Sequence, residues 1–330
     1  MNVYLKAYLK KNLGDDLFVK IITDRYPNTN FYSFSLNNYS EKCYNSNLKV
    51  ASGIKIKLEK ALQKISRGKY RIERRYIKDT DSTILIGGSM FIQYKNFLYS
   101  NMLEHYNNKK YYIIGTNFGP YNTEEYKKSV KYFLKDAEDV CFRDQYSYEC
   151  FKELANIRYS PDIVFSMNTD EIMAQEKKEV FISVIDCNKK FSQKETEKYE
   201  ELIINIIRLY INKGYKIILG SFCKDENDEI AVKRIVKKCS ENEKKYIEKY
   251  FYRGNLNEAL KKISEAKIIV GTRFHANVVG LLLNKTIIPI IYSNKTKNML
   301  NDINFKGRNY WYEQYEYYRI KWNYRTVFGL

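Results

Sequence analysis

KIIVGTRFHANVVGLLLNKTIIPIIY (267–292) contains two short apolar runs separated by a stretch of helical length. The runs at 267–271 and 286–292 are rich in isoleucine and short, as is typical of strands that are buried on both faces. The stretch 274–283 between them is apolar enough to cover a sheet. A strand, a helix and a second strand in this order predict a parallel α/β unit.

The same alternation runs through most of the chain. Further strands are predicted at 82–88, 110–119, 139–144, 179–186, 216–222 and 250–254. Helices are predicted at 94–107, 123–137, 145–154, 199–210, 227–240 and 256–265. Together these elements predict an α/β protein with two Rossmann-like domains whose parallel sheets face a central cleft.

The domain boundaries follow from the polar, non-periodic stretch near 166–178, which is expected to act as a hinge. It divides an N-terminal domain, 1–170, from a C-terminal domain, 171–305. The remaining segment, 306–330, is unusually aromatic. We expect this tail to pack on the body of the protein; a surface that binds the acceptor or faces a membrane is the alternative.

The composition limits the class of protein. A chain of 330 residues with 44% hydrophobic residues can form two globular domains. It shows neither a signal peptide nor an apolar run long enough to cross a bilayer, so a cytoplasmic protein is expected. Six cysteines without a C-x-x-C pair and only two histidines indicate reduced thiols and no metal site.

The formal net charge of +18 has two interpretations. Such an excess is typical of proteins that bind nucleic acid or an anionic membrane. Lysines are spread over nearly every predicted helix, so a compositional bias of the whole chain is the simpler interpretation. No nucleic-acid-binding signature is present and no nucleic-acid partner is expected, whereas a peripheral contact with an anionic membrane surface stays open.

Ligands in open α/β sheets bind where strands end and helices begin. Gly87, Gly88 and Ser89 directly follow a predicted strand, and they form either a tight turn or an acceptor or phosphate loop. They match neither the dinucleotide fingerprint nor the P-loop. Asp15 and Asp16 lie at the first predicted joint between a strand and a helix, where one caps the helix or contacts an acceptor hydroxyl as a base.

The strongest candidates for catalysis are Arg273 and His275. They follow the strand at 267–271 and stand two residues apart, so that both can point into one cleft. Arginine offers a planar fork for a carboxylate or a phosphate, and histidine exchanges a proton near neutral pH. We therefore predict that this pair is catalytic.

Other polar residues at strand ends are candidates for binding a donor. Arg143, beside Asp144, either forms a buried ion pair that braces the first domain or binds an anion. Lys295, three residues past the last predicted strand, is placed to meet a phosphate. The predicted donor-binding residues are Arg143, Ser293, Lys295 and Asn117.

Several segments, in order along the chain, resemble the polysaccharide pyruvyl transferase family. They are NLGDDL (12–17), ILIGGSMF (84–91), IIGTNFGPY (113–121), CFRDQYSYE (141–149), SPDIVFSM (160–167) and GTRFHANVVGLLLNKTIIPIIYSNKTKNML (271–300). The last segment is the most specific, with its Arg-x-His pair and a Tyr-x-x-Lys group. A departure is the short GGS stretch, where many relatives have a longer glycine run.

This resemblance implies a two-domain fold akin to the GT-B glycosyltransferases, with phosphoenolpyruvate as donor and a saccharide, lipid-linked or free, as acceptor. It implies that Arg273 and His275 serve donor binding and catalysis, with phosphoenolpyruvate as a co-substrate and no cofactor. On this hypothesis His275 protonates the methylene carbon of the donor, and the product is a pyruvate ketal of a cell-surface polysaccharide or capsule. A sugar-nucleotide-dependent glycosyltransferase on the same architecture is the alternative.

Overall fold

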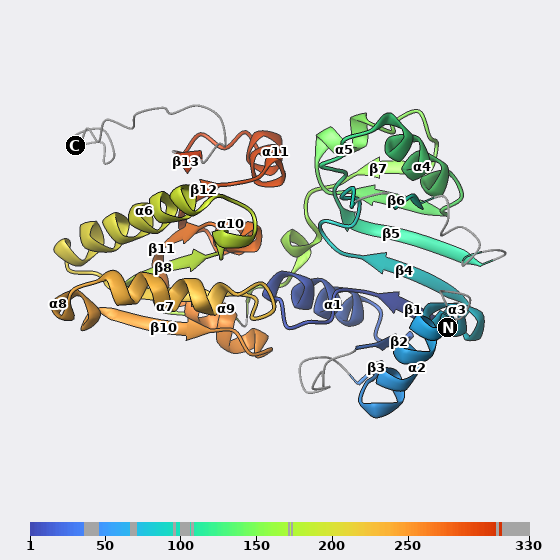
Figure 1. Cartoon of the computed structure of the whole chain (residues 1–330), viewed down its shortest axis with the longest axis horizontal. Helices are drawn as coiled ribbons and strands as arrows, with labels where there is room; N and C mark the ends of the chain where they lie inside the picture. The colour runs from blue at the N-terminus through green and yellow to red at the C-terminus, as the bar shows by residue number, and fades with distance from the viewer. Residues whose placement is uncertain are drawn as a thin grey trace.

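The computed structural model describes residues 1–35, 46–66, 71–94, 97–99, 106, 109–170, 172, 174–307 and 310–311. The described residues form two α/β halves, each built on one parallel sheet. Figure 1 shows the halves side by side, with the N-terminal half at the right and the C-terminal half at the left. The fold is therefore the predicted α/β class with two parallel sheets.

The N-terminal half is built on a seven-stranded sheet with the order β3-β2-β1-β4-β5-β6-β7. Its strands are β1 (Asn2–Lys6), β2 (Asn30–Phe34), β3 (Leu48–Ala51), β4 (Ser82–Ile86), β5 (Lys110–Thr116), β6 (Asp139–Phe142) and β7 (Ile157–Tyr159). Its helices are α1 (Leu13–Arg25), α2 (Ile54–Ile65), α3 (Ile72–Asp79), α4 (Glu124–Lys135) and α5 (Gln145–Glu149). A short 3-10 helix, η3 (Ile163–Ser166), follows the last strand.

The C-terminal half contains a six-stranded sheet with the order β10-β9-β8-β11-β12-β13. Its strands are β8 (Lys177–Val184), β9 (Lys216–Ser221), β10 (Ile247–Phe251), β11 (Ala266–Gly271), β12 (Thr286–Ile291) and β13 (Tyr310–Trp311). Its helices are the 3-10 helix η4 (Cys187–Lys189), α6 (Gln193–Asn212), α7 (Asp228–Lys238), α8 (Glu241–Lys244), α9 (Leu256–Glu265), α10 (Phe274–Leu282) and α11 (Asn294–Asp302).

Both sheets reverse their strand order at one position. In the first sheet the reversal lies between β1 and β4, and in the second between β8 and β11. In parallel sheets of this kind, the loops leaving the two strands at the reversal diverge and leave a crevice for a ligand. The topology therefore predicts one ligand-binding crevice in each half, at the carboxyl ends of the strands on either side of the reversal.

The two halves share a hydrophobic core through α1. Figure 1 shows α1, in dark blue, extending from the first half toward the second. Leu17 and Phe18 on α1 belong to the same buried cluster as Phe274 and Val278 on α10. At the same junction the hydroxyl of Tyr252 donates a hydrogen bond of 2.6 Å to Asp16. The junction is thus a packed interface.

Most predicted elements are found, with shifted ends. The predicted strand at 250–254 lies earlier, as β10, because the chain turns away from the sheet after Phe251. The predicted helix at 94–107 lies largely outside the described residues. Sequence reasoning missed β2, β3, β7, β13, α2, α3, α8 and α11. The boundaries 1–170 and 171–305 stay a prediction; the two sheets use strands within 2–159 and 177–311.

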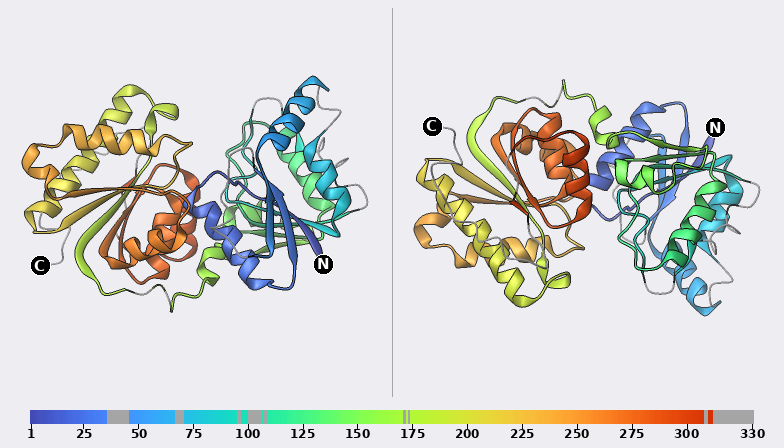
Figure 2. Two further views of the ribbon diagram at one scale, coloured as in Figure 1. Left: turned by 90° about the horizontal axis from the view of Figure 1, so that it is seen from below. Right: turned by 90° about the horizontal axis from the view of Figure 1, so that it is seen from above.

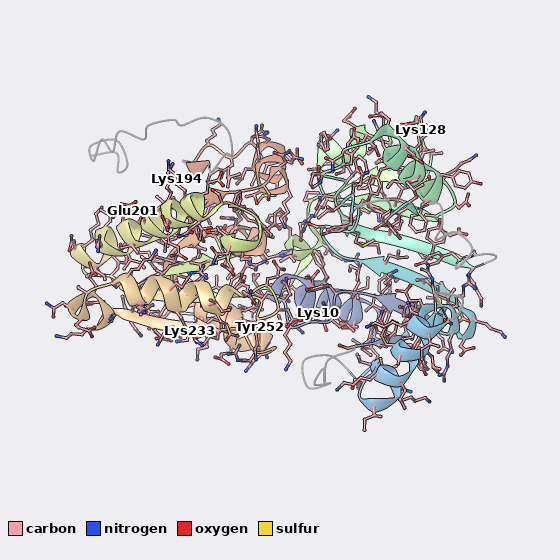
Figure 3. All side chains as sticks on the ribbon, in the orientation of Figure 1. Lys10, Lys128, Lys194, Glu201, Lys233 and Tyr252 are labelled. Carbon is pink, nitrogen blue, oxygen red and sulfur yellow. The ribbon has the colours of Figure 1, made fainter. Side chains whose placement is uncertain are left out.

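Two further predictions concern the surface and the tail. Figure 3 shows basic side chains on both halves, for example Lys128 on α4, Lys194 on α6 and Lys233 on α7. Of the tail 306–330, the described part ends in β13, which pairs with β12 at the edge of the second sheet; the rest lies outside the described residues. No helix in the described part of the chain has both the length and the apolar character to cross a bilayer.

Candidate active site

A cavity of about 630 Å³ lies between the two halves. Residues from the ends of β1, β4, β11 and β12 contribute to its walls, so the crevices of the two sheets face each other. The lining residues are Lys6, Ala7, Tyr8, Asn12, Gly14, Asp15, Leu85, Ile86, Gly87, Gly88, Ser89, Met90, Ile92, Tyr94, Tyr99, Arg143, Lys190, Glu226, Arg273, Phe274, His275, Tyr292 and Lys295.

Three helices begin beside this cavity. The side chain of Asn12 caps α1 by accepting a hydrogen bond of 3.1 Å from the amide of Gly14. Helices α10 and α11 have no side-chain cap, because neither Arg273 nor Ser293 accepts a hydrogen bond from the first turn. Uncapped helix starts present amide N–H groups and a partial positive charge, both of which attract anions.

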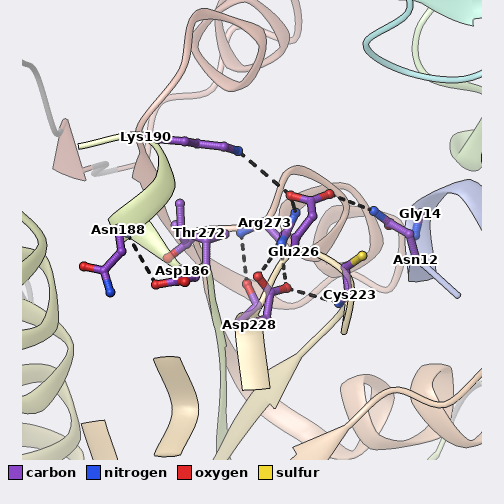
Figure 4. A network of polar contacts seen from close by, with 12 residues as sticks. Asn12, Gly14, Asp186, Asn188, Lys190, Cys223, Glu226, Asp228, Thr272 and Arg273 are labelled. Atoms are coloured by element: carbon purple, nitrogen blue, oxygen red, sulfur yellow. Dashed lines mark hydrogen bonds and ion pairs between the residues drawn. The ribbon is translucent and has the colours of Figure 1, made fainter. Parts of the chain in front are cut away.

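Arg273 is held by acidic residues of its own half (Figure 4). Its Nε donates to Asp228 at 2.9 Å and one terminal nitrogen donates to Glu226 at 2.8 Å, while the other terminal nitrogen also pairs with Asp228. Burial alone would lower the pKa of Arg273, but Asp228 and Glu226 hold it well above its ordinary value. The guanidinium fork therefore faces the cavity with its donors already engaged by carboxylates.

Figure 4 shows that this network continues toward both halves through Glu226. The Glu226 carboxylate lies 3.9 Å from the Nζ atom of Lys190 and accepts a hydrogen bond of 3.5 Å from Asn12. Asn12 starts α1 in the N-terminal half, and Lys190 follows η4 in the C-terminal half. Arg273 thus belongs to a polar network that lines the cavity and joins residues of both halves.

His275 stands in the first turn of α10 against the start of α1. Its Nε2 lies 3.6 Å from an oxygen of Asp162, which is too long for a hydrogen bond but close enough for electrostatic attraction. Its ring packs edge-on against Phe18 with centroids 5.0 Å apart. Gly14 leaves room for the ring, because a Cβ at that position would overlap it.

The environment of His275 favours the neutral ring. Burial lowers the pKa of His275, Asp162 opposes this shift, and the nearby cations Arg143 and Lys295 lower the pKa further. These influences together favour the neutral imidazole. An anionic ligand beside it would raise this pKa and favour its protonation.

Arg143 forms the buried ion pair that the sequence suggested, but with a different partner. Its guanidinium donates to Asp162 and to Asn117, both at 2.8 Å, and stacks on the ring of Phe274 at 4.1 Å. Asp144, the expected partner, instead accepts hydrogen bonds from Ser147 and caps α5. The interpretation of an Arg143–Asp144 pair was wrong because the side chain of Asp144 is turned into the helix start.

The glycine pair after β4 also has an explanation within the protein. A Cβ at Gly88 would come within 2.5 Å of the Arg143 guanidinium, whereas a Cβ at Gly87 would meet only Met90, at 3.4 Å. Gly88 therefore makes space for an arginine. Both glycines and Ser89 line the cavity, so Gly87 and Ser89 keep the position expected of an acceptor or phosphate loop.

Lys295 is the cation best placed to meet an added anion. It lines the cavity in the first turn of α11 and has no salt-bridge partner within the described ranges. Burial lowers its pKa, and although Tyr292 opposes this shift, the cations Arg143 and Lys190 strengthen it. Burial raises the pKa of Tyr292, but Lys295, Lys190 and Arg273 together hold it below its ordinary value. The wall formed by Lys190, Tyr292 and Lys295 is strongly electropositive.

Asp15 lines the cavity from the first turn of α1. Burial and the neighbouring Asp16 raise its pKa to about 7, against the lowering effect of Arg143 and Lys295. A carboxyl group with this pKa can accept or release a proton near neutral pH. The capping alternative for Asp15 and Asp16 was wrong, because Asn12 caps α1.

The structure brings most of the predicted site residues together. The cavity is lined by His275, Arg273, Arg143, Lys295, Gly87, Gly88, Ser89 and Asp15. Asn117 and Ser293 are not among its lining residues: Asn117 supports Arg143, and Ser293 starts α11 with a buried hydroxyl.

Sequence reasoning assigned no role to Lys190, Glu226, Tyr292 and Asp162. Asp162 stands in SPDIVFSM, so its place in a resembling segment was an available signal. Glu226 stands in the acidic run KDENDE (224–229), which is typical of an exposed helix start. Lys190 stands in an equally ordinary polar loop. Nothing in these two loops distinguishes the residue that reaches the cavity from its neighbours.

Two parallel sheets facing each other across a cleft at their strand reversals define the GT-B-like class of two-domain enzymes. The chain belongs to the polysaccharide pyruvyl transferase family, whose family model matches residues 12–294. It is accordingly an enzyme of transferase type.

Solved structures support the fold class. The chain is similar to Anabaena HepE, solved in complex with UDP and glucose, with 9% identity, a TM-score of 0.53, and coverage of 94% of this chain and 84% of that chain. It is also similar to UDP-GlcNAc 2-epimerase from Methanocaldococcus jannaschii, with 11% identity, a TM-score of 0.51, and coverage of 94% and 88%. A glycosyltransferase from Rickettsia africae gives 10% identity, a TM-score of 0.50, and coverage of 94% and 83%. At these identities the likeness concerns the fold alone.

Proposed function

We propose that this enzyme transfers a pyruvyl group from phosphoenolpyruvate to two hydroxyl groups of a saccharide and forms a pyruvate ketal. The observation that carries the proposal is the cavity between the halves. It combines Lys295, a cation without a salt-bridge partner among the described residues, with the uncapped starts of α10 and α11 and with two proton-exchanging groups, His275 and Asp15. Family membership supports the same reaction.

The donor is the more highly charged substrate, and its phosphate and carboxylate suit the electropositive wall. Lys295 and the amide groups that begin α11 supply charge and hydrogen bonds to one anionic group. The start of α10 forms a second site that attracts an anionic group, beside His275. Arg273 acts as a positioning residue, because its donors are engaged by Asp228 and Glu226.

The chemistry requires one proton on the donor and the loss of one proton from each acceptor hydroxyl. In the proposed sequence, the bound anion raises the pKa of His275, and the imidazolium protonates the methylene carbon of phosphoenolpyruvate. The first hydroxyl attacks the central carbon as Asp15 takes its proton. The phosphate then leaves, and the second hydroxyl closes the ketal. The two hydroxyl groups release two protons in total. One replaces the proton that His275 gave to the methylene carbon, which is now a methyl group, and the other leaves with the phosphate.

The same cavity is proposed to face the cytoplasm, where phosphoenolpyruvate is available, and to take its saccharide from the N-terminal half. Gly87 and Ser89 line that side, opposite Tyr292 and Lys295. A neutral saccharide needs directional hydrogen bonds more than charge, and short side chains with accessible backbone provide them. No cofactor or metal has a role in this scheme.

The first experiment measures stabilisation of the full chain by phosphoenolpyruvate. A ligand at about 100 times its dissociation constant adds roughly 2.7 kcal/mol to the free energy of unfolding, so a clear rise in melting temperature is expected. Lys295→Ala removes a cation from the electropositive wall of the cavity and is expected to abolish this rise. Lys297→Ala, on the exposed side of the same helix, is the matched control and is expected to retain it.

The outcomes separate the proposal from its rival. A rise in the wild type and in Lys297→Ala, but not in Lys295→Ala, supports a donor bound at the start of α11. Stabilisation by UDP-sugars and none by phosphoenolpyruvate would favour a sugar-nucleotide-dependent glycosyltransferase. An equal rise in all three proteins would move the donor away from Lys295.

A further inference from the structure

Helix α2 exposes a stripe of large apolar side chains on the outer edge of the N-terminal half. The exposed fractions are 77% for Ile54, 61% for Leu58, 54% for Leu62 and 78% for Ile65. Large apolar residues usually pack into a core, and a contiguous exposed set marks an interaction surface. Figure 1 places α2 at the periphery of its half, and none of its residues lines the cavity.

The stripe is a property of the helix geometry. At about 100° per residue, Ile54, Leu58, Leu62 and Ile65 fall within an arc of roughly 80° on one side of the helix. The residues of α2 that are buried, Ile56 and Glu59, lie on the other side. Helix α2 therefore packs against the protein through the face that carries Ile56 and Glu59, and it exposes the apolar stripe to solvent.

Lysines border the stripe. On the same projection of about 100° per residue, Lys55 lies at one edge, and Lys57 and Lys64 lie at the other. The helix has a single acidic residue, Glu59, and its carboxylate is buried against the protein, where it pairs with Arg75 at 3.0 Å. The outward surface of α2 thus combines apolar side chains with positive charge.

We infer that α2 docks the protein on an anionic lipid bilayer, lying in the plane of the interface. In this arrangement the apolar stripe enters the boundary between headgroups and acyl chains, and the bordering lysines contact anionic headgroups. Lysines next to an anionic membrane surface are attracted to it, and their long aliphatic stems let the ammonium groups reach the headgroup level. The inference does not depend on the proposed pyruvyl transfer.

Charge complementarity favours an anionic bilayer over the other partners that could cover the apolar stripe. A second copy of this chain would bring two lysine borders together, and each copy has a net charge of +18. The tail beyond Trp311 contains three basic residues and two acidic ones, so it offers no complementary charge either. An anionic bilayer complements both the apolar stripe and its border.

The test is co-sedimentation of the full chain with phosphatidylcholine vesicles, with and without phosphatidylglycerol. The wild type is expected to bind the anionic vesicles and to lose binding as salt rises. Leu58→Ser/Leu62→Ser is expected to weaken binding at least tenfold without lowering the melting temperature, because both side chains are exposed. Lys57→Gln/Lys64→Gln is expected to remove the preference for phosphatidylglycerol.

Matched controls change exposed residues of the same types elsewhere. Ile230→Ser on α7 and Lys194→Gln/Lys261→Gln on α6 and α9 are expected to bind like the wild type. Failure of the wild type to bind, or equal binding by the α2 variants and the controls, would overturn the inference. A change in sedimentation mass on Leu58→Ser/Leu62→Ser would instead identify a second copy as the occupant. Binding that appears only after removal of 312–330 would identify the tail.

Discussion

Asp15 and Asp162 are carboxyl groups at one site with opposite pKa shifts. Burial raises the pKa of Asp162 in isolation, but His275 and Arg143 outweigh it and lower the pKa to about 2. Asp15 has a pKa of about 7, because burial and Asp16 outweigh the attraction of the cations. One carboxyl is therefore a permanent charge, and the other exchanges its proton under physiological conditions.

The pKa of Asp15 predicts how Asp15→Asn changes stability with pH. A carboxyl whose folded pKa is raised stabilises the fold while protonated, and this contribution is lost as pH rises from its unfolded pKa of about 3.9 through about 7. Asparagine stays neutral. Asp15→Asn is therefore expected to melt at the same temperature as the wild type only below about pH 3.9, and at a higher temperature above about pH 7, while losing transferase activity at every pH.

Melting temperatures across this pH range, together with turnover, check the prediction. Asp24→Asn is the control, since Asp24 is an exposed carboxyl of the same helix that pairs with Lys20 at 2.8 Å. It is expected to show no gain at high pH and to keep its activity. A uniform loss of stability in Asp15→Asn would contradict the raised pKa, and retained turnover would exclude Asp15 as the base.

At the level of elements, the turn after β4 is shaped by its contact with Arg143, the residue that follows β6. Arg143 comes directly after β6, and its guanidinium lies on the backbone of Gly88. The two glycines of this turn are therefore not equivalent. A Cβ at Gly88 would overlap the guanidinium of Arg143, whereas a Cβ at Gly87 would make only an ordinary van der Waals contact with Met90.

Gly88→Ala is expected to destabilise the protein by about 1–3 kcal/mol, because its methyl group overlaps a guanidinium that is fixed by two hydrogen bonds. Gly87→Ala, the adjacent substitution, is expected to change the free energy of unfolding by less than about 0.5 kcal/mol. Denaturant titration of both variants measures the difference. Equal effects would mean that Arg143 moves freely, contrary to its pairing with Asp162.

The elements also show what the sequence could predict. Apolar runs such as 216–222 and 267–271 predicted buried parallel strands because only such strands are apolar throughout. The spacing of Ile54, Leu58, Leu62 and Ile65 is equally regular, but it does not tell whether a stripe faces a core or the exterior. That depends on the neighbouring elements, and here β3 and α3 leave the stripe uncovered.

The same limit applies to the site. The strand ends identified Arg273, His275, Arg143 and Lys295 because parallel strands end at one edge of a sheet. The ion pairs of Arg273 were not predictable, since its partners Asp228 and Glu226 stand 45 and 47 positions earlier in the chain. A local pattern contains no information on contacts at such separations. The structure was therefore needed to show that Lys295, unlike Arg273, has no salt-bridge partner among the described residues.

For the whole molecule, the shared core predicts cooperative unfolding. Domains joined by a small polar interface unfold separately, whereas the buried cluster around α1 includes side chains of both halves. Calorimetry is expected to show one transition, with the calorimetric enthalpy close to the van't Hoff enthalpy. Two resolved transitions would show that the junction contributes little to stability. Phe18→Ala, at this junction, is expected to separate the transitions or broaden the single one.

Asp162 lies immediately before η3, in the segment that connects the two halves, and it contacts residues of both: Arg143 at 2.8 Å and His275 at 3.6 Å. The connector therefore contributes a side chain to the proposed active site in addition to joining the two halves. The two halves therefore cannot be exchanged independently between related proteins. A chimera that joins the first half of one relative to the second half of another must therefore keep the contacts of Asp162 with both Arg143 and His275.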